Sequence, residues 1–443
     1  MLTVQLKLSH KRDWVEILVN KLSLLIIILL FTNNCSFNEN QRIWKIKNTK
    51  IEDEKNIKEL FLKEKKNTVE FNAQLKLKLI KTGFNKNAVE NKNNFGSFKY
   101  MGLLKETISY KFSKLQNVDK LNHKPIFLND GIIFFNKKGD LIRYRKDKKI
   151  IWKKNYYSKS EKKTQKNLVL ATVKKNLLVS DDIGKYYSID INTGELIWSK
   201  RNTYSFNSEI KVFNDKFFVI DYKNTLRCYD ITSGSECWSL KTTDSFILSN
   251  NKHSLIILNN SIIFTNSLGD ITSVDVDTGL ILWQLPTQSN NIIDENYTFK
   301  NSKLVSDGKS IFFSNNRNQF YSIDSSNGTV NWINKINSNL TPVIIDNFIF
   351  TISNDGYLFV IQKEKGNIIR INDIYKEYKK KKRSDITPIG FVVGLTNLYL
   401  TNNDGKMIIS DLISGNILAT KKVSNGLISE PFIFNENLFI IRN

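Results

Sequence analysis

The sequence predicts an all-β protein built as an eight-bladed β-propeller of four-stranded antiparallel blades. A motif recurs seven times between residues 139 and 423, clearest as YYSIDINTGELIW (186–198) and ITSVDVDTGLILW (271–283). The ends of successive copies lie 38 to 49 residues apart, which is the length of a four-stranded blade and not of a helical repeat. An extended apolar run, such as FFVI (217–220), precedes each copy.

Each copy reads as a β-hairpin. Apolar and polar residues alternate up to an Asp or Asn, a small polar turn follows, and a second alternating run closes the motif. The turn needs a left-handed residue, and glycine adopts that conformation without strain. The turn glycines are Gly194, Gly234, Gly279, Gly328, Gly366 and Gly415. The Asp residues before them, such as Asp190 and Asp230, can accept hydrogen bonds from turn amides, so a structural role is favoured over a catalytic one.

A tryptophan ends five of the copies. These residues are Trp152, Trp198, Trp238, Trp283 and Trp332. Each can bury about 150–250 Å² between neighbouring blades, so we expect core positions and not nucleic-acid stacking platforms. The last two copies, LFVIQKEKGNIIR (358–370) and MIISDLISGNILA (407–419), lack the Trp.

The chain holds eight apolar runs against seven hairpins, so it ends two strands into an eighth blade. The unpaired edge that results would invite aggregation. Two alternating stretches before the first repeat, QLKLKLI (74–80) and ETISYKF (106–112), are therefore expected to complete the last blade and join the two ends of the propeller.

The alternating run, the Asp, the Thr-Gly or Ser-Gly turn and the Trp four residues later resemble the pyrroloquinoline-quinone-type propeller repeat. The resemblance covers about residues 125–443. It implies the fold but not a function, because several unrelated functions share this propeller.

The N-terminus has the features of an export signal. Leu22 to Phe31 is apolar, basic residues precede it, and Cys35 follows. The run is short for a membrane-spanning helix and typical of a secretory signal. A single Cys after such a run resembles a bacterial lipoprotein signal, which would make Cys35 an acylation site, and an uncleaved signal anchor is the alternative. We therefore divide the chain into a signal segment (1–35), a polar tether (36–70) and the propeller (71–443).

The net charge of +23 raises the question of an anionic partner. Lysine accompanies Asn and Ile throughout the sequence, which favours biased codon usage over nucleic-acid binding. The one dense cluster, Lys376 and 379–383, is interpreted as a solvated loop, with anionic lipid headgroups as the alternative ligand.

Catalytic motifs are not apparent. The histidines, His10, His123 and His253, are far apart, and no metal-ligand spacing, phosphate-binding glycine loop or nucleophile elbow is present. The sequence thus predicts no enzyme activity, cofactor or metal. Cys228 and Cys237 lie on the two arms of the third hairpin. Pairing Tyr229 with Glu236 would set them opposite each other, as two thiols or, in an exported protein, as a disulfide.

The chain is similar to the BamB-type outer-membrane protein assembly lipoproteins, which are exported propellers of about this size. The similarity implies a non-catalytic scaffold at the periplasmic face of the outer membrane, monomeric within a complex and bound to the barrel-inserting (BamA-type) component of the assembly machinery. The loops between central blades would meet this partner, through Phe246, Ile247, Leu248, Asp294 and Glu295. The alternatives are a divergent periplasmic adaptor with another protein partner and a quinoprotein dehydrogenase-like enzyme.

Overall fold

The computed structural model describes residues 70–79, 100, 109–110, 123–164, 166–243, 252–287, 300–315 and 317–442. The chain divides into two compact units, Met1–Asn67 and Thr68–Asn443, and the described residues all belong to the second. The signal segment, Cys35 and most of the tether lie outside them. No helix in this described part of the chain is both long and apolar enough to span a membrane.

Thirty strands form eight sheets in the described residues, seven with four antiparallel strands and one with two. Sheet 1 contains β1 (Ile126–Leu128), β2 (Gly131–Phe135), β3 (Leu141–Arg145) and β4 (Ile150–Lys154). Sheet 2 contains β5 (Leu168–Val173), β6 (Asn176–Asp181), β7 (Lys185–Asp190) and β8 (Leu196–Arg201). Sheet 3 contains β9 (Lys211–Phe213), β10 (Lys216–Ile220), β11 (Thr225–Asp230) and β12 (Glu236–Lys241). Sheet 4 contains β13 (Leu255–Leu258), β14 (Ser261–Thr265), β15 (Ile271–Asp275) and β16 (Ile281–Leu285). Sheet 5 contains β17 (Val305–Ser306), β18 (Ser310–Asn315), β19 (Gln319–Asp324) and β20 (Val330–Asn334).

Sheet 6 contains β21 (Val343–Ile345), β22 (Phe348–Ile352), β23 (Tyr357–Gln362) and β24 (Ile368–Asp373). Sheet 7 contains β25 (Pro388–Val393), β26 (Asn397–Asn402), β27 (Lys406–Asp411) and β28 (Ile417–Lys422). Sheet 8 contains β29 (Phe432–Phe434) and β30 (Asn437–Phe439). Two short helices, η2 (Glu161–Lys163) and α4 (Lys380–Arg383), lie in connections between sheets. The prediction of an all-β, eight-bladed propeller is confirmed.

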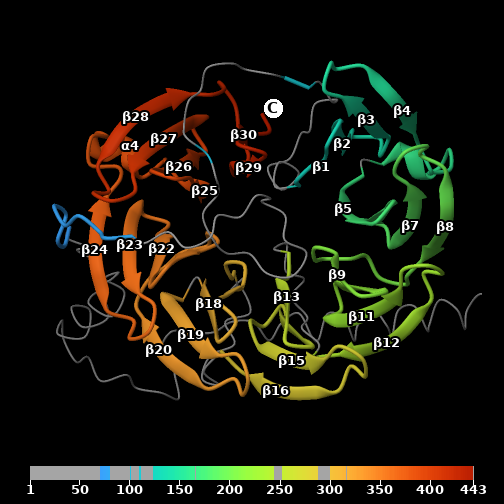
Figure 1. The fold of residues 1–443 in the computed structure, drawn as a ribbon, viewed down its shortest axis with the longest axis horizontal. Helices are drawn as coiled ribbons and strands as arrows, with labels where there is room; N and C mark the ends of the chain where they lie inside the picture. Colours follow the sequence, from blue (N-terminus) through green and yellow to red (C-terminus); the bar gives the residue numbers. More distant parts are fainter. Residues whose placement is uncertain are drawn as a thin grey trace, which may run out of the picture. The chain divides into compact units, whose positions relative to one another are not determined.

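The sheets of this unit follow one another in chain order around a common centre (Figure 1). The first strand of each sheet is innermost: β5 contacts β1 and β9, β13 contacts β9, and β29 contacts β25. The second strands are buried on both faces, as in GIIFF of β2, because sheets pack against each side of them. The fourth strands lie on the outside, and those of sheets 2 and 3, β8 and β12, show alternating exposure.

Each hairpin between the third and fourth strands forms as the sequence indicates. Asp190 Oδ1 accepts hydrogen bonds from the amides of Asn192 and Thr193, both at 2.8 Å. Gly194 has a φ of 70°, in the left-handed region. Each of the seven hairpins also contains a β-bulge, which inserts one extra residue into the fourth strand just before the Trp position.

The tryptophans join neighbouring sheets. In every case the indole Nε1 donates to a backbone carbonyl of the next sheet's hairpin. The acceptors of Trp152, Trp198, Trp238, Trp283 and Trp332 are Ile191, Ile231, Val276, Ser325 and Lys363, at 3.0 to 3.2 Å. The ring covers the turn glycine of that hairpin, so closely that a Cβ on Gly279 would lie 2.6 Å from Trp238. Each indole therefore fixes one sheet to the next.

Arg370 takes the place of the missing Trp in sheet 6. Its guanidinium donates to Leu412 O at 3.2 Å, the position that an indole reaches in the other sheets, and to Ile413 O. It also donates to Leu75 O at 3.1 Å, and Phe71 pairs with Ile371 of β24. A polar side chain at this position thus holds an additional segment between sheets 6 and 7.

The placement of residues 74–80 in the last blade was therefore wrong for residues 74–79. They lie beside β24 and the hairpin of sheet 7, where Leu77 N donates to Ile413 O at 3.1 Å and the Leu77 side chain is buried. Of the second stretch, 106–112, only residues 109 and 110 are described. Tyr110 lies against Tyr144 of β3, with ring centroids 5.9 Å apart.

Sheets 1 and 8 meet through aromatic side chains. Phe127 of β1 contacts Phe432, Phe434 and Phe439, with ring centroids 5.7, 4.6 and 4.5 Å apart. Residues from the first and last parts of the propeller thus pack together without a third strand in sheet 8 among the described residues.

Candidate partner-binding face and central ionic network

In each four-stranded sheet the fourth strand ends, and the first strand begins, at the same end of the sheet, so the described parts of the connections between sheets lie at this end. Because the strands are antiparallel, the turns between second and third strands lie at this end as well. We call it the connection face. An Asx residue builds several of these turns: Asp221 Oδ1, for example, accepts from Lys223 N at 2.9 Å and Thr225 N at 3.1 Å. The opposite end carries the Trp-covered hairpins.

The residues predicted to meet a partner, Phe246, Ile247, Leu248, Asp294 and Glu295, lie outside the described residues. The starts of the two connections that contain them are described, and both are fixed at the connection face. Asn224 accepts from Thr242 N at 3.1 Å and donates to Thr243 O at 3.0 Å. Thr287 Oγ1 donates to Gly269 O at 2.9 Å.

Asn224 links these two starts to each other. Its side chain donates to Ser267 Oγ at 2.7 Å, and its Oδ1 accepts from Ser267 N at 3.0 Å. Ser267 and Gly269 belong to the same turn of sheet 4. Both predicted partner connections therefore start beside the turn formed by residues 266–270, on one face of the molecule.

A network of ion pairs lies near the centre, at the connection-face ends of the innermost strands. Lys303, before β17, contacts Glu209, before β9, at 2.6 Å and Glu430, before β29, at 3.8 Å. Lys124 contacts Glu430 at 3.5 Å, and Lys211 contacts Glu209 at 3.1 Å. Sheets 3, 5 and 8 are not neighbours, so the two contacts of Lys303 cross the centre of the unit.

The network holds its carboxylates charged. Burial alone would raise the pKa of Glu209, but Lys303 and Lys211 outweigh it and hold the pKa well below its usual value. Burial opposes the charge of Lys303, yet Glu209 and Glu430 raise its pKa. Charges paired in this way tie non-adjacent sheets together.

Two buried histidines lie beside the network. Burial and the nearby Lys252 hold the pKa of His123 well below its usual value, and Lys252 Nζ lies 3.2 Å from His123 Nδ1. Burial lowers the pKa of His253 to about 4. Both imidazoles are therefore neutral at pH 7.

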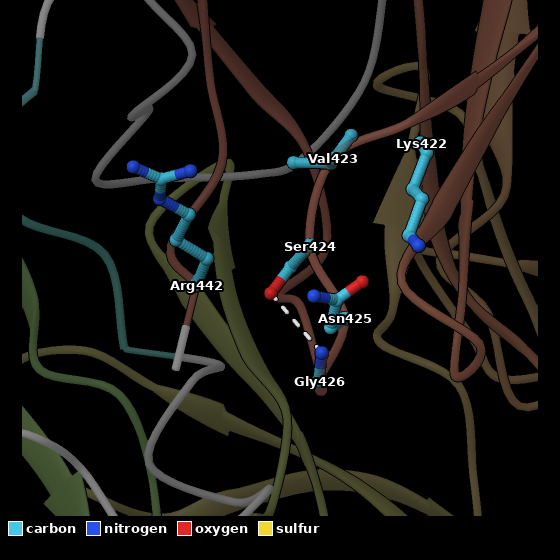
Figure 2. Close-up of a pocket in the computed structure, with 6 residues that line it drawn as sticks. All are labelled: Lys422, Val423, Ser424, Asn425, Gly426 and Arg442. Carbon is cyan, nitrogen blue, oxygen red and sulfur yellow. Dashed lines mark hydrogen bonds between the residues drawn. The ribbon is translucent and has the colours of Figure 1, made fainter.

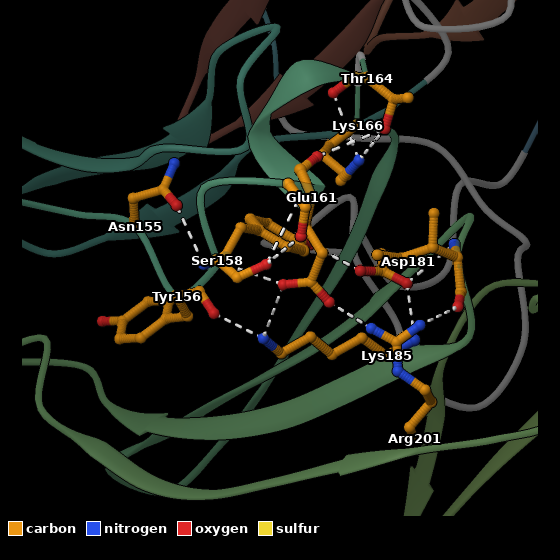
Figure 3. Close-up of polar contacts among 12 residues, drawn as sticks. Asn155, Tyr156, Ser158, Glu161, Thr164, Lys166, Asp181, Lys185 and Arg201 are labelled. Carbon is orange, nitrogen blue, oxygen red and sulfur yellow. Dashed lines mark hydrogen bonds and ion pairs between the residues drawn. The ribbon is translucent and has the colours of Figure 1, made fainter.

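Polar contacts also hold the connection between sheets 1 and 2 (Figure 3). Glu161 lies 3.7 Å from Lys185 and pairs with Arg201. Tyr157 donates to Asp181 Oδ2 at 2.7 Å, while Asp181 Oδ1 accepts from Lys185 N at 2.7 Å. Every one of these groups serves another residue of the chain, so we interpret the cluster as a structural support of the connection face.

A depression of about 500 Å³ opens beside the connection between sheets 7 and 8 (Figure 2). The residues that line it are Lys422, Val423, Ser424, Asn425, Gly426 and Arg442. Lys422 and Arg442 stand on its two sides, and the six residues include no carboxylate, imidazole or thiol. The charged side chains of the lining are therefore all basic. In the described ranges, no three His, Cys, Asp or Glu side chains are grouped so that they could hold a metal ion.

The lysine-rich cluster at 376–383 lies in the connection between sheets 6 and 7. Arg383 pairs with Asp373 at 2.8 Å, and Lys376 lies 3.9 Å from Glu70. Lys382 lies over the ring of Tyr378, 5.7 Å from its centroid. Several of these basic side chains therefore have partners within the chain.

Repeat, sheet order and inter-sheet Trp contacts define a propeller of the pyrroloquinoline-quinone-like class. Residues 116–372 match the family model described as outer membrane protein assembly factor BamB. The chain belongs to this family. The match includes both connections with predicted partner residues. A search of curated protein sequences finds no match.

Solved structures share the fold at low sequence identity. The crystal structure of BamB from Moraxella catarrhalis is 18% identical, with a TM-score of 0.57 over 72% of this chain and 90% of that one. The computationally designed Ika8 protein is 10% identical, with a TM-score of 0.54 over 75% and 99% of the two chains. Quinohemoprotein alcohol dehydrogenase from Comamonas testosteroni is 10% identical, with a TM-score of 0.53 over 72% and 70%. BamB, a designed protein and an alcohol dehydrogenase thus share this fold.

Proposed function

We propose that this protein is a non-catalytic scaffold that assists outer-membrane β-barrel protein assembly by binding the assembly machinery. The observation that carries the proposal is the family match over residues 116–372, which spans sheets 1 to 6 and both partner connections. A rigid propeller that displays loops from one face suits such a role, because fixed loop ends reduce the entropy lost on binding.

The connection face between sheets 3 and 5 is the proposed binding surface. Asn224 and the turn at 266–270 hold the starts of the two connections beside each other. Phe246, Ile247 and Leu248 would supply apolar contacts, and Asp294 and Glu295 would pair with basic residues of the partner. The partner is the barrel-inserting component of the machinery, and the scaffold acts as a monomer within that complex.

The N-terminal segment would keep the propeller at the periplasmic face of the outer membrane. Acylation of Cys35 is one route to attachment, and an uncleaved signal anchor is the other. Either tether raises the local concentration of the scaffold near a membrane-bound partner. Mass spectrometry of the mature N-terminus distinguishes them, since only the first leaves a lipid on Cys35.

A non-catalytic role agrees with how the polar groups of the described residues are used. Hairpin carboxylates accept hydrogen bonds from the backbone amides of their own turns. Lys303 forms ion pairs with Glu209 and Glu430 across the centre. These groups already serve the fold, so we do not assign them to a quinone site.

Affinity purification from the native envelope tests the proposal. We expect the wild-type chain to capture the barrel-inserting protein, and Phe246→Ala combined with Leu248→Ala to weaken the capture at least tenfold. The matched control is Glu195→Ala, because Glu195 is an exposed residue of a hairpin at the opposite end of the sheets. Capture of only soluble periplasmic proteins would favour the adaptor alternative, and quinone-dependent alcohol oxidation by the purified chain would contradict the scaffold role.

A further inference from the structure

The two cysteines of sheet 3 lie at a β-bulge between β11 and β12. Tyr229 pairs with Glu236, as the sequence indicates, but Cys228 pairs with Trp238. Cys237 is the extra residue of the bulge. In a bulge two residues oppose one, so Cys237 and Trp238 share Cys228 as their partner across the strands.

The same bulge in sheet 5 shows that side chains at these two positions meet. Ser322 pairs with Trp332, and Asn331 is the extra residue. Asn331 Nδ2 donates to Ser322 Oγ at 3.2 Å. Cys228 and Cys237 occupy the corresponding positions in sheet 3, so we expect their sulfur atoms to lie on the same side of the hairpin, close to each other.

The two thiols differ in access to solvent. Cys228 is fully buried, Cys237 is exposed, and both are free. Lys216 of β10 interacts electrostatically with both sulfurs and pairs with Asp277 of the next sheet at 2.7 Å. An exposed thiol beside a buried one, near a cation, suits stepwise exchange with an external disulfide.

We propose that Cys228 and Cys237 form a reversible disulfide by exchange with a disulfide-bearing oxidant. The Cys237 thiolate attacks one sulfur of the oxidant, which forms a mixed disulfide and releases one thiol. Cys228 then loses its proton and attacks the Cys237 sulfur, which releases the second thiol. The protein loses two electrons and two protons, and the oxidant is reduced from one disulfide to two thiols.

The order of events follows from burial. The oxidant reaches Cys237 first, because Cys228 is closed to solvent. Burial, together with the neighbouring Cys237 thiol, also raises the pKa of Cys228, which disfavours its thiolate. We therefore expect the second step to be slower than the first. The bond links the two arms of one hairpin, so it leaves the sheet order unchanged.

Peptide mapping of the full chain treated with glutathione disulfide tests the inference. Cleavage after Arg227 and Lys241 gives one peptide, 228–241, that contains both cysteines and excludes Cys35. We expect this peptide to lose the mass of two hydrogens and to regain it with dithiothreitol. In Cys228→Ser, the peptide should instead retain one glutathionyl group at Cys237. In Cys237→Ser, it should remain unmodified.

A transplanted pair provides the control for geometry. Ser322→Cys with Asn331→Cys, in a chain that also carries Cys228→Ser and Cys237→Ser, should form the equivalent disulfide in sheet 5. A native peptide that stays fully reduced, or that stops as the mixed disulfide, while the transplanted pair oxidises would overturn the inference.

Discussion

The contact between Gly279 and Trp238 provides a quantitative test of how the sheets are joined. Gly279 has a φ of 72°, and a Cβ there would lie 2.6 Å from Trp238 Cε3 and 2.7 Å from Cδ2. Gly308 has a φ of 97°, and a Cβ there would have no atom within 4 Å. The two glycines therefore share backbone strain on substitution, but only Gly279 has the steric contact.

Gly279→Ala should lower the free energy of unfolding more than Gly308→Ala. A left-handed alanine costs about 1–2 kcal/mol, and overpacking against a fixed ring adds about 1–3 kcal/mol. We expect a loss of about 2–5 kcal/mol for Gly279→Ala and about 1–2 kcal/mol for Gly308→Ala. Urea denaturation, followed by tryptophan fluorescence and circular dichroism, measures both.

A double-mutant cycle isolates the contact. Trp238→Ala alone should cost about 3–5 kcal/mol, because it leaves a cavity between sheets 3 and 4. In that background the loss from Gly279→Ala should fall to the level of Gly308→Ala, since the ring is gone. Equal losses from the two glycines in the wild-type background, or additive effects of Trp238→Ala and Gly279→Ala, would refute the reasoning.

Three further predictions concern the polar interior. Lys303→Met should destabilise the fold by about 1–3 kcal/mol in urea denaturation, because it leaves two half-buried carboxylates with fewer cations. Adding Glu209→Gln removes one of these charges and should recover part of the lost stability. If the double variant recovers none of it, the network does not stabilise the fold as described. Burial lowers the pKa of His253 to about 4, whereas in the unfolded chain this histidine binds a proton below about pH 6.5. The free energy of unfolding should therefore fall as the pH drops from about 6.5 to 4, with a loss of about 2 kcal/mol at pH 5. Urea midpoints at pH 7.5 and 5 should show a smaller difference for His253→Gln than for the wild type, and an unchanged difference would contradict this. Arg370→Ala should speed hydrogen exchange at the Leu77 amide, since Arg370 holds Leu75 O, while amides of sheet 2 stay protected; equal protection of Leu77 in both proteins would contradict the role of Arg370.

Local patterns in the sequence were sufficient to predict the propeller. The alternating runs, the turn glycines and the recurring Trp all act over one hairpin or between adjacent blades, so their spacing predicts eight blades directly. The Tyr229–Glu236 pairing was also predicted correctly, since it depends on a single turn.

Longer-range features could not be predicted in the same way. In the sequence motif, Arg370 stands at the position where other copies have a Trp, and the motif gives no role for it. In the structure, Arg370 binds a carbonyl of sheet 7 and the segment at 70–79. The link from Lys303 to Glu430 joins residues far apart in sequence and depends on the whole arrangement of sheets. The bulge at Cys237 adds one residue to a strand, which alternation alone does not reveal.

Site-specific photo-crosslinking in the native envelope tests the central claim most directly. A photoreactive residue at position 246 or 294 places the probe on the connections that the account assigns to partner binding, and one at position 195 places it on the opposite end of the sheets. The account predicts adducts with the barrel-inserting assembly protein from positions 246 and 294 and none from 195. Adducts of equal yield from all three positions, or none with that protein from any of them, would contradict it.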